Sequence, residues 1–342
     1  MTRFQSRFRV SSRYIGHSEP CFIIAEGGVN HNGKLSLAKK LVEAAIDAGA
    51  DAIKFQTFNT ENLVSNALSR NQFDMLKKLE LPGESFLELV DYAKGQKIAF
   101  FSTPFDEESV ATLDRAGVPV FKISSGDLNN LPLLRVIAKR GRPIILSTGM
   151  STMAEISEAV DAIARHCQKL VLTHCTSLYP PKFDEINLKA MNTIGAAFCA
   201  PVGYSDHTLG YEVSLAAVVL GACVIEKHLT LDKKMKGPDH KASLEPSEFA
   251  GMVKSIRNIE QSLGTKEKGP VPREKGMRAY ARKSITAIKK IAKNAEIIEG
   301  DIAILRPGNG IEPKYFDNIM GCRAKVDIRP GQQIKWDMLH RK

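Results

Sequence analysis

The 342-residue chain is predicted to have an α/β architecture, a (β/α)8 TIM barrel followed by a small, mostly β domain. Three observations support this prediction. Eight short apolar runs alternate with segments of helical periodicity between residues 21 and 228, as β-α units of a barrel do. The runs are apolar throughout, which is typical of parallel strands buried on both faces. After Glu260 the pattern changes to short runs separated by Gly and Pro, as in a small β domain.

The apolar runs are the predicted barrel strands. In chain order they are Cys21–Glu26, Ala52–Gln56, Ile98–Thr103, Val120–Ser124, Pro143–Thr148, Leu170–His174, Val202–Ser205 and Cys223–His228. A doubly wound open sheet is the competing fold. Against it, no G-x-G-x-x-G follows the first run, and the sequence contains no G-x-x-x-x-G-K-[ST] motif.

Segments between the runs carry the helical pattern. In Leu35–Ala48, apolar residues recur at i, i+3, i+4 and i+7, and Gly49 follows where a helix commonly ends. Glu84–Ala93 and Ala154–Ala164 have the same periodicity. These patterns predict a barrel domain over residues 1–263, including a short N-terminal extension.

The remainder of the chain is predicted to be a linker and a second domain. Residues 264–283 include a Gly-, Pro- and Lys-rich stretch and are interpreted as a linker. Residues 284–342 contain the short runs SITAI, AEII, DIAIL, GCRAKVDI and QQIKW. A domain of this size is near the lower limit for an independent core, so docking onto a barrel would stabilise it.

Composition narrows the class of protein. Apolar residues make up 43% of the chain and charged residues 25%, which is ordinary for a globular protein. The six cysteines include no C-x-x-C pair and are interpreted as reduced thiols of a cytoplasmic protein. No signal peptide and no membrane span are expected, because no h-region and no run of 18 apolar residues occur.

The net charge of +10 is concentrated in one stretch. Between Lys266 and Lys293, ten Lys or Arg face two Glu, which gives +8 and leaves the rest of the chain near neutral. Nucleic-acid binding is not expected, since it would need a broader basic face with aromatic platforms. The stretch either attracts anionic substrates or is a solvated linker.

Polar side chains end nearly every predicted strand. The C-terminal strand ends of a barrel form its active-site face, so these side chains are expected to converge. They are Glu26, Lys54, Gln56, Ser102, Thr103, Lys122, Ser124, Ser125, Asp127, Ser147, Thr148, His174, Ser205, Asp206, His207, Glu226 and His228. Because unpaired polar groups are unfavourable in a barrel mouth, the set favours a functional site over a solvated rim.

Two histidines follow adjacent predicted strands. Neutral imidazoles at His207 and His228 would suit a divalent ion such as Mn²⁺, Zn²⁺ or Fe²⁺ in a weak site used for Lewis-acid chemistry. A hydrogen-bonded pair without metal is the alternative. Asp206 and Glu226 are candidates to orient the imidazoles. His174 is a further candidate ligand, although a core histidine fits it better.

Cations and hydroxyl groups lie at other strand ends. Lys54 and Lys122, with the hydroxyls of Thr103, Ser125 and Ser147, suit a phosphate or carboxylate. This composition predicts an anionic substrate without identifying it. A Schiff-base lysine is also compatible with the pattern.

The strings that carry these residues resemble the sialic acid synthase family, which comprises N-acetylneuraminate, legionaminate and pseudaminate synthases. Nine motifs occur in order from about Phe22, namely FIIAEGGVNHNG, IKFQTF, FSTPFD, FKISSGDLNNLPLL, ILSTGM, THCTSLYP, GYSDHT, IEKHLTLD and KGPDHKASLEP. The tail Ser284–Leu339, with LRPGNG, resembles the family's SAF, or antifreeze-like, domain.

The resemblance implies a fold, an assembly and a reaction. The fold is a (β/α)8 barrel followed by a SAF domain of the β-clip type. The assembly is a domain-swapped homodimer in which each small domain caps the partner's barrel. The reaction condenses phosphoenolpyruvate with an open-chain N-acyl mannosamine-type sugar, in which water attacks C2, the C–O bond breaks and phosphate leaves. Mn²⁺ is the expected ion, with Mg²⁺ and Co²⁺ as alternatives.

The resemblance also implies residue roles. The expected metal ligands are His207 and His228, and the expected catalytic residues are these two with Glu26, Lys122 and Asp127. The expected substrate-binding residues are Lys54, Gln56, Thr103, Ser125, Ser147, Tyr179, Ser205, Glu226 and Arg306, the last reaching the sugar's N-acyl group from the partner subunit. One position departs from the family, which mostly has SGE where this chain has Ser125-Gly126-Asp127. The shorter side chain leaves the role of Asp127 open.

Within the family, N-acetylneuraminate synthesis from N-acetylmannosamine is the favoured reaction, and the overall motif wording disfavours pseudaminate synthesis. The alternative within the family is N,N'-diacetyllegionaminate synthesis from 2,4-diacetamido-2,4,6-trideoxymannose. Outside it, a Schiff-base aldolase predicts borohydride trapping of Lys54 or Lys122 and indifference to EDTA. A catalytically silent sugar-acid-binding protein is the alternative from another class, and ice binding by the tail fits its charged residues poorly.

Overall fold

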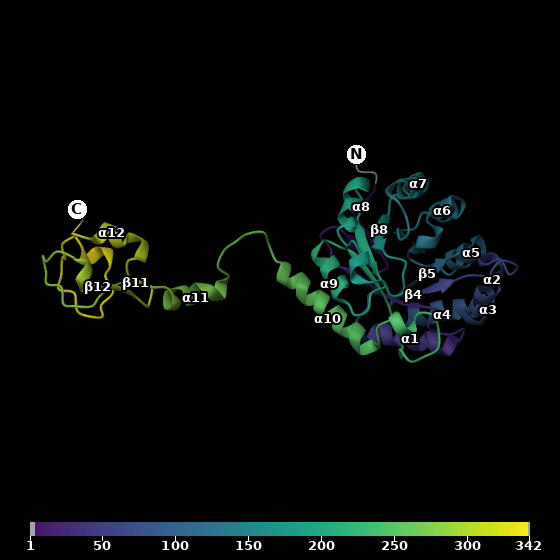
Figure 1. Cartoon of the computed structure of the whole chain (residues 1–342), viewed down its shortest axis with the longest axis horizontal. Helices are drawn as coiled ribbons and strands as arrows, with labels where there is room; N and C mark the ends of the chain where they lie inside the picture. Colours follow the sequence, from purple (N-terminus) through teal and green to yellow (C-terminus); the bar gives the residue numbers. More distant parts are fainter. Residues whose placement is uncertain (1–3, 341–342) are drawn as a thin grey trace. The chain divides into compact units, whose positions relative to one another are not determined.

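The structure, a computed structural model, describes residues 4–340. The residues up to Gly264 form one compact unit, and those from Thr265 onward form another. In the first unit, eight parallel strands close into a barrel in the order β10-β3-β4-β5-β6-β7-β8-β9, and Figure 1 shows helices surrounding them. This arrangement confirms the predicted (β/α)8 barrel and excludes the open sheet.

The barrel strands coincide with the predicted apolar runs to within two residues at every end. Their bounds are β3 Phe22–Gly28, β4 Ala52–Thr57, β5 Ala99–Pro104, β6 Phe121–Ile123, β7 Ile144–Ser147, β8 Leu170–Cys175, β9 Val202–Asp206 and β10 Val224–His228. Nearly every residue in them is buried. Burial on both faces explains why the runs are continuously apolar rather than alternating.

Helices follow the strands and pack their apolar stripes against the barrel. They are α1 Leu35–Asp47, α2 Thr60–Leu63, α3 Arg70–Leu79, α4 Gly83–Gly95, α5 Glu107–Arg115, α6 Leu131–Ala138, α7 Met153–Ala164, α8 Ala190–Phe198, α9 Glu212–Val219 and α10 Pro246–Leu263. In α1 the buried residues include Leu41, Val42 and Ala45, as the spacing predicts. Gly49 adopts a φ of 78° just past its end, a conformation that glycine tolerates best.

An N-terminal hairpin covers the end of the barrel opposite the active-site face. Strands β1 (Arg7–Val10) and β2 (Arg13–Gly16) pair antiparallel. The backbone N–H of Gln5 donates to the carbonyl of Gln168, and Arg13 pairs with Asp51. Both acceptor residues lie within two residues of the start of a barrel strand. The sequence pattern indicated only a short extension here, because the hairpin's strands are too short for a clear alternation.

The C-terminal unit contains less regular strand than the apolar runs predict. Strands β11 (Ser284–Ala287) and β12 (Ile302–Leu305) form a two-stranded antiparallel sheet, and short helices α11 (Pro272–Ala281) and α12 (Phe316–Ile319) accompany it. The other predicted runs contribute isolated β-bridges. A separate core of buried side chains, mostly isoleucine, stabilises this unit. Among residues 4–340, no helix combines the length and apolar character needed to cross a membrane.

Candidate active site

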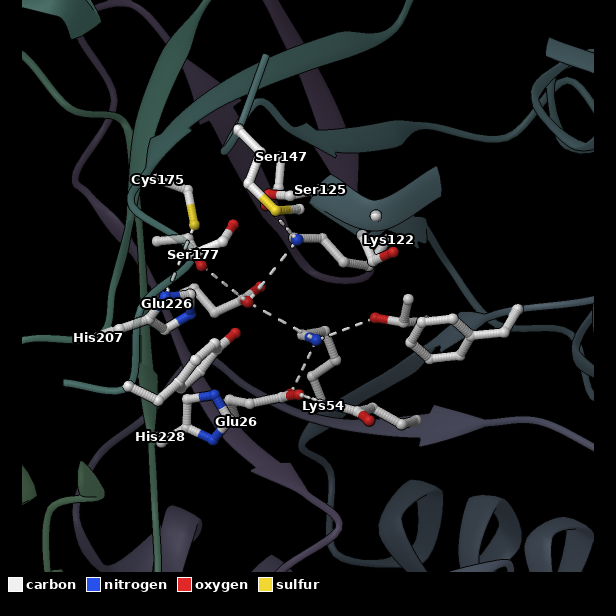
Figure 2. A pocket seen from close by; sticks show the side chains of 18 residues that line it. Glu26, Lys54, Lys122, Ser125, Ser147, Cys175, Ser177, His207, Glu226 and His228 are labelled. Atoms are coloured by element: carbon white, nitrogen blue, oxygen red, sulfur yellow. Dashed lines mark hydrogen bonds and ion pairs between the residues drawn. The ribbon is translucent and has the colours of Figure 1, made fainter. Parts of the chain in front are cut away.

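A pocket of about 360 Å³ opens at the C-terminal ends of the barrel strands. Twelve of the residues with a predicted catalytic, substrate-binding or metal-binding role line it, and Figure 2 shows most of them pointing inward. They are Glu26, Lys54, Gln56, Thr103, Lys122, Ser125, Ser147, Tyr179, Ser205, His207, Glu226 and His228. The pocket therefore lies where barrel topology places an active site.

Strand alternation explains the convergence of these side chains. Each barrel strand, or the loop directly after it, contributes at least one inward-facing polar residue, because every second residue of a strand points into the barrel. Adjacent strands hold these residues in register, as in the pairing of Glu26 with Lys54 and of Gln56 with Thr103. Residues far apart in the sequence are thereby fixed by the most rigid part of the fold.

Two buried lysines line one half of the pocket. Lys54 Nζ lies 2.9 Å from Glu26 Oε2 and donates a 3.0 Å hydrogen bond to Thr103 Oγ1. Lys122 Nζ donates to Ser147 Oγ. Figure 2 shows Glu226 between the two ammonium groups, 3.6 Å from Lys54 Nζ and 3.7 Å from Lys122 Nζ.

The two carboxylates of this network have opposite electrostatic environments. Burial raises the pKa of Glu26 to about 7, because the nearby Lys54 offsets only part of the desolvation. For Glu226, burial also disfavours the charged form, but Lys122 and Lys54 outweigh it and lower the pKa to about 2. Glu226 is therefore ionised at neutral pH, whereas Glu26 can take up or release a proton there.

Two imidazoles form the other half of the pocket. The ring centroids of His207 and His228 are 5.6 Å apart, and the ring of Tyr179 stacks on His207 at 4.0 Å. The Nδ1 of His207 lies 2.8 Å from the carbonyl oxygen of Thr176, which makes Nδ1 the donor and leaves Nε2 with its lone pair. Burial lowers the pKa of His228, so that ring is neutral at pH 7.

The histidine pair fits a divalent ion that takes its remaining ligands from water or substrate. The buried Nδ1 of His228 has no hydrogen-bond partner, and neutral imidazole is the form that binds metal. No cluster of three or more His, Cys, Asp or Glu suited to a metal occurs within residues 4–340. Any ion here would therefore be held by few protein ligands, as expected of an exchangeable site.

Family models match both units of the chain. Residues 41–268 match the NeuB family, and residues 282–340 match the SAF domain. The first match covers most of the barrel and two thirds of the whole chain. The chain belongs to the NeuB family. The resemblance that the nine motifs indicated is thus confirmed.

Relatives of this NeuB-family chain are named as synthases of different sugar acids. It is 45% identical to the N,N'-diacetyllegionaminic acid synthase of Legionella pneumophila, with 94% of this chain and 95% of that protein covered. It is 36% identical to the human N-acetylneuraminate-9-phosphate synthase, with 96% and 95% covered. A solved structure of the sialic acid synthetase from Leptospira borgpetersenii, in complex with citrate, is 37% identical, with a TM-score of 0.74 and 79% and 94% covered.

Two of the predicted site residues of this family member do not line the pocket. Asp127 lies in the short 3-10 turn Ser125–Asp127, where its Oδ2 accepts a 2.7 Å hydrogen bond from Ser124 and its Oδ1 a 3.4 Å bond from Asn130. The carboxylate is thus engaged within its own loop. Arg306 belongs to the C-terminal unit and directly follows β12, where its side chain is exposed.

His174 is placed away from the histidine pair. It lies on β8 next to Cys175, and its Nε2 hydrogen-bonds the carbonyl oxygen of Ile186 at 2.7 Å. Strand alternation turns it outward, while Cys175 points into the pocket. The interpretation of His174 as a structural histidine fits this contact.

Sequence reasoning missed several lining residues of the NeuB-family pocket. They are Phe105, Gly126, Met150, Cys175 and Ser177, together with Ser124, which was noted only as a strand end. Alternation along β8 could have identified Cys175, because Thr173 two residues earlier hydrogen-bonds Ser147 inside the barrel. The others lie outside the strands, where no periodicity of the sequence indicates which way a side chain points.

Proposed function

We propose that this chain condenses phosphoenolpyruvate with the open-chain form of an N-acyl mannosamine-type sugar, giving a nine-carbon sialic-type acid and phosphate. One observation carries the proposal: a single pocket joins two buried lysines with hydroxyl donors to two buried imidazoles beside an aromatic ring. The first set suits a phosphate and a carboxylate, and the second suits a polarised aldehyde on a sugar. Two reactants held in one pocket meet without a diffusional encounter.

The lysine half would bind phosphoenolpyruvate. Lys54 and Lys122 offer ammonium groups, and Ser125 and Ser147 offer hydroxyl donors around the same space. Glu226 lies near both ammonium groups and favours their charged forms, which offsets part of the burial that lowers the pKa of Lys122. Since that carboxylate already neutralises one lysine, a ligand with a carboxylate and a phosphate needs further positive charge. A divalent ion at the histidine pair would supply it.

The imidazole half would bind the sugar. His207 and His228 would hold a divalent ion, Mn²⁺ being our expectation, which when bound acts as a Lewis acid toward the aldehyde oxygen. Tyr179 offers a flat surface for the sugar chain, and Gln56, which donates to Glu26 Oε1 at 3.4 Å, fixes that carboxyl group. Glu26 is placed to exchange a proton with the sugar, because its pKa is about 7.

The proposed reaction balances as follows in atoms and charge. C3 of phosphoenolpyruvate forms a carbon–carbon bond with the aldehyde carbon, whose oxygen gains a proton. Water adds its oxygen to C2, the bond between C2 and the bridging oxygen breaks, and phosphate leaves with that oxygen. Of the two protons of the water, one balances the proton gained by the aldehyde oxygen and the other leaves with the phosphate. Asp127 would orient this water only through an intervening molecule, because its carboxylate is held within its own loop.

The sugar is proposed from the relatives. The chain is 45% identical to a protein named N,N'-diacetyllegionaminic acid synthase and 36% identical to one named for N-acetylneuraminate 9-phosphate. This difference favours 2,4-diacetamido-2,4,6-trideoxymannose over N-acetylmannosamine, the sugar that the sequence analysis favoured. Both sugars have the N-acyl group and aldehyde that the pocket requires.

The proposal includes an assembly and a compartment. We place the reaction in the cytoplasm, in keeping with six cysteines that are all unpaired, five of them buried. We further propose a domain-swapped homodimer, in which the partner subunit's Arg306 reaches the sugar's N-acyl group. An exposed arginine on a small unit with its own core is suited to this role.

Isotope labelling tests the proposed bond cleavage. The reaction is run in H2¹⁸O with phosphoenolpyruvate and each sugar, and the acid and the phosphate are analysed by mass spectrometry. We expect one ¹⁸O in the nine-carbon acid, at C2, and unlabelled phosphate. Label in the phosphate would show cleavage at phosphorus and would reject the proposed step.

A further inference from the structure

An ion pair lies directly behind the two histidines and does not line the pocket. Asp206 is the last residue of β9, and Lys227 precedes the last residue of β10. The two are opposite each other in the strand register. Lys227 Nζ lies 3.0 Å from Asp206 Oδ2, and both side chains are 0% exposed. Each residue immediately precedes one histidine of the pair.

The remaining hydrogen bonds of this ion pair hold the backbone on both sides of His207. Asp206 Oδ1 accepts from the N–H of Thr208 at 2.9 Å and from its hydroxyl at 2.8 Å. Lys227 Nζ donates to the carbonyl oxygen of Thr208 at 2.6 Å. Because Asp206 precedes His207 and Thr208 follows it, the loop that carries His207 is tied to the strand that carries His228.

A third element fixes the pair from outside. Ser214, in α9, donates a 2.6 Å hydrogen bond to Asp206 Oδ2. The side chains two residues earlier on each strand, Tyr204 and Ile225, occupy the same outward face of β9 and β10 and are fully buried. Asp206 and Lys227 thus lie between the strands and the helix layer, where apolar side chains would ordinarily pack.

Stability does not account for a buried ion pair at this place. The desolvation of two charges offsets most of their attraction, and apolar replacements of similar volume are often at least as stable. Unlike apolar side chains, the ion pair makes hydrogen bonds of defined direction. These bonds connect β9, β10 and the loop that follows β9. The residues so connected are those next to His207 and His228.

We propose that Asp206 and Lys227 are positioning residues that set the separation and orientation of His207 and His228, and thereby the affinity of this site for a divalent ion. The inference rests on the proposed function, because it assumes that the two imidazoles bind metal. It adds that the affinity depends on two residues that contact neither metal nor substrate.

The test compares D206N/K227M with the parent full-length protein. The double substitution replaces the ion pair by neutral side chains of similar size, so that no charge is left buried and unpaired. Proteins freed of metal with EDTA are titrated with Mn²⁺, and the free ion is measured by its electron paramagnetic resonance signal. Thermal unfolding and the KM for phosphoenolpyruvate are measured in parallel.

We expect Mn²⁺ affinity to fall about tenfold or more in D206N/K227M, as it does when residues that support metal ligands are changed. The KM for phosphoenolpyruvate is expected to change little, because Lys54 and Lys122 lie on other strands. R257M is the matched control. It removes the 2.8 Å ion pair of Arg257 with Asp51, which precedes β4 at the opposite end of the barrel, and should leave Mn²⁺ affinity unchanged.

T208V provides a second variant should the double variant fail to fold. It removes one hydroxyl donor to Asp206 while leaving the ion pair, and we expect a smaller loss of Mn²⁺ affinity in the same direction. Unchanged Mn²⁺ affinity in D206N/K227M, or in T208V if that is the only folded variant, overturns the positioning role. Absence of Mn²⁺ binding in the parent overturns this inference together with the metal site. Unchanged Mn²⁺ affinity in D206N/K227M, together with loss of Mn²⁺ binding in H228A, overturns the positioning role and leaves the proposed function intact.

Discussion

The ring of Tyr179 stacks on the imidazole of His207, with centroids 4.0 Å apart and planes inclined by 30°. The same phenol ring meets His228 nearly edge-on, with centroids 5.8 Å apart and an interplanar angle of 84°. One aromatic side chain therefore contacts both imidazoles and limits how either can turn.

Removal of this ring is expected to weaken sugar binding. Y179A should raise the KM for the sugar, because the stacking surface and the constraint on His207 are lost together. Y179F keeps the ring and serves as the control, so its KM should stay close to that of the parent. Steady-state kinetics with saturating phosphoenolpyruvate measure both. A sugar KM in Y179A equal to that of the parent would contradict a role for the stack.

The lysine half should respond differently. K122M is expected to raise the KM for phosphoenolpyruvate by about tenfold or more, because hydrogen bonds to charged groups contribute about 1.5–3 kcal/mol. K289M, on the exposed surface of the C-terminal unit, is the control for loss of one positive charge.

Borohydride treatment in the presence of pyruvate should not label Lys54 or Lys122, whereas a trapped adduct would favour a Schiff-base aldolase.

The fold was predictable where physical periodicity exists. The eight strands follow from continuous apolar runs, because both faces of each strand are buried. The inward residues at strand ends follow from barrel topology and alternation, which is why Lys54, Lys122 and Glu226 were predicted. Loop residues such as Met150 and Ser177 were not, because their direction depends on tertiary contacts.

The roles of Asp127 and Lys227 could not be predicted from their sequence motifs alone. The motif at Ser125-Gly126-Asp127 gives no sign that the carboxylate bonds Ser124 and Asn130 instead of facing the pocket. Lys227 was passed over because it lies between two inward residues of β10. Only its contacts with Asp206 and Thr208 reveal what it holds.

Titration of Glu26 predicts how stability varies with pH. Its pKa is raised from 4.5 to about 7 by burial, so between these values the folded protein binds more protons than the unfolded chain. The Glu26 contribution to the free energy of unfolding therefore falls as pH rises from about 4.5 to about 7. E26Q should flatten this dependence. Urea unfolding in EDTA across this range measures it, and identical profiles for E26Q and the parent would contradict the assignment.

Mn²⁺ binding should depend on His207 and His228 but not on His174. H207A and H228A are each expected to abolish measurable Mn²⁺ binding, since a site with two protein ligands loses half of them. H174A should retain Mn²⁺ binding, because that ring hydrogen-bonds Ile186 outside the pocket. Isothermal titration calorimetry of the three variants measures this. Loss of binding in H174A as well would require a different ligand set.

A mixing experiment tests the swapped dimer. H228A and R306A should each be inactive, but after denaturation and joint refolding they should recover activity. In a mixed dimer, the intact barrel of the R306A chain receives Arg306 from the H228A chain. Random pairing restores about a quarter of the parent's sites. No recovery would indicate that Arg306 acts within its own chain or not at all.

The release of phosphate by the metal-free protein tests the central claim most directly. Protein treated with EDTA is given phosphoenolpyruvate with 2,4-diacetamido-2,4,6-trideoxymannose or with N-acetylmannosamine, with and without Mn²⁺. We predict phosphate release that requires both a sugar and Mn²⁺ and is faster with the diacetamido sugar. Faster release with N-acetylmannosamine would keep the reaction and assign the chain to neuraminate synthesis. No phosphate with either sugar and any divalent ion would contradict the account and favour a silent sugar-acid-binding protein.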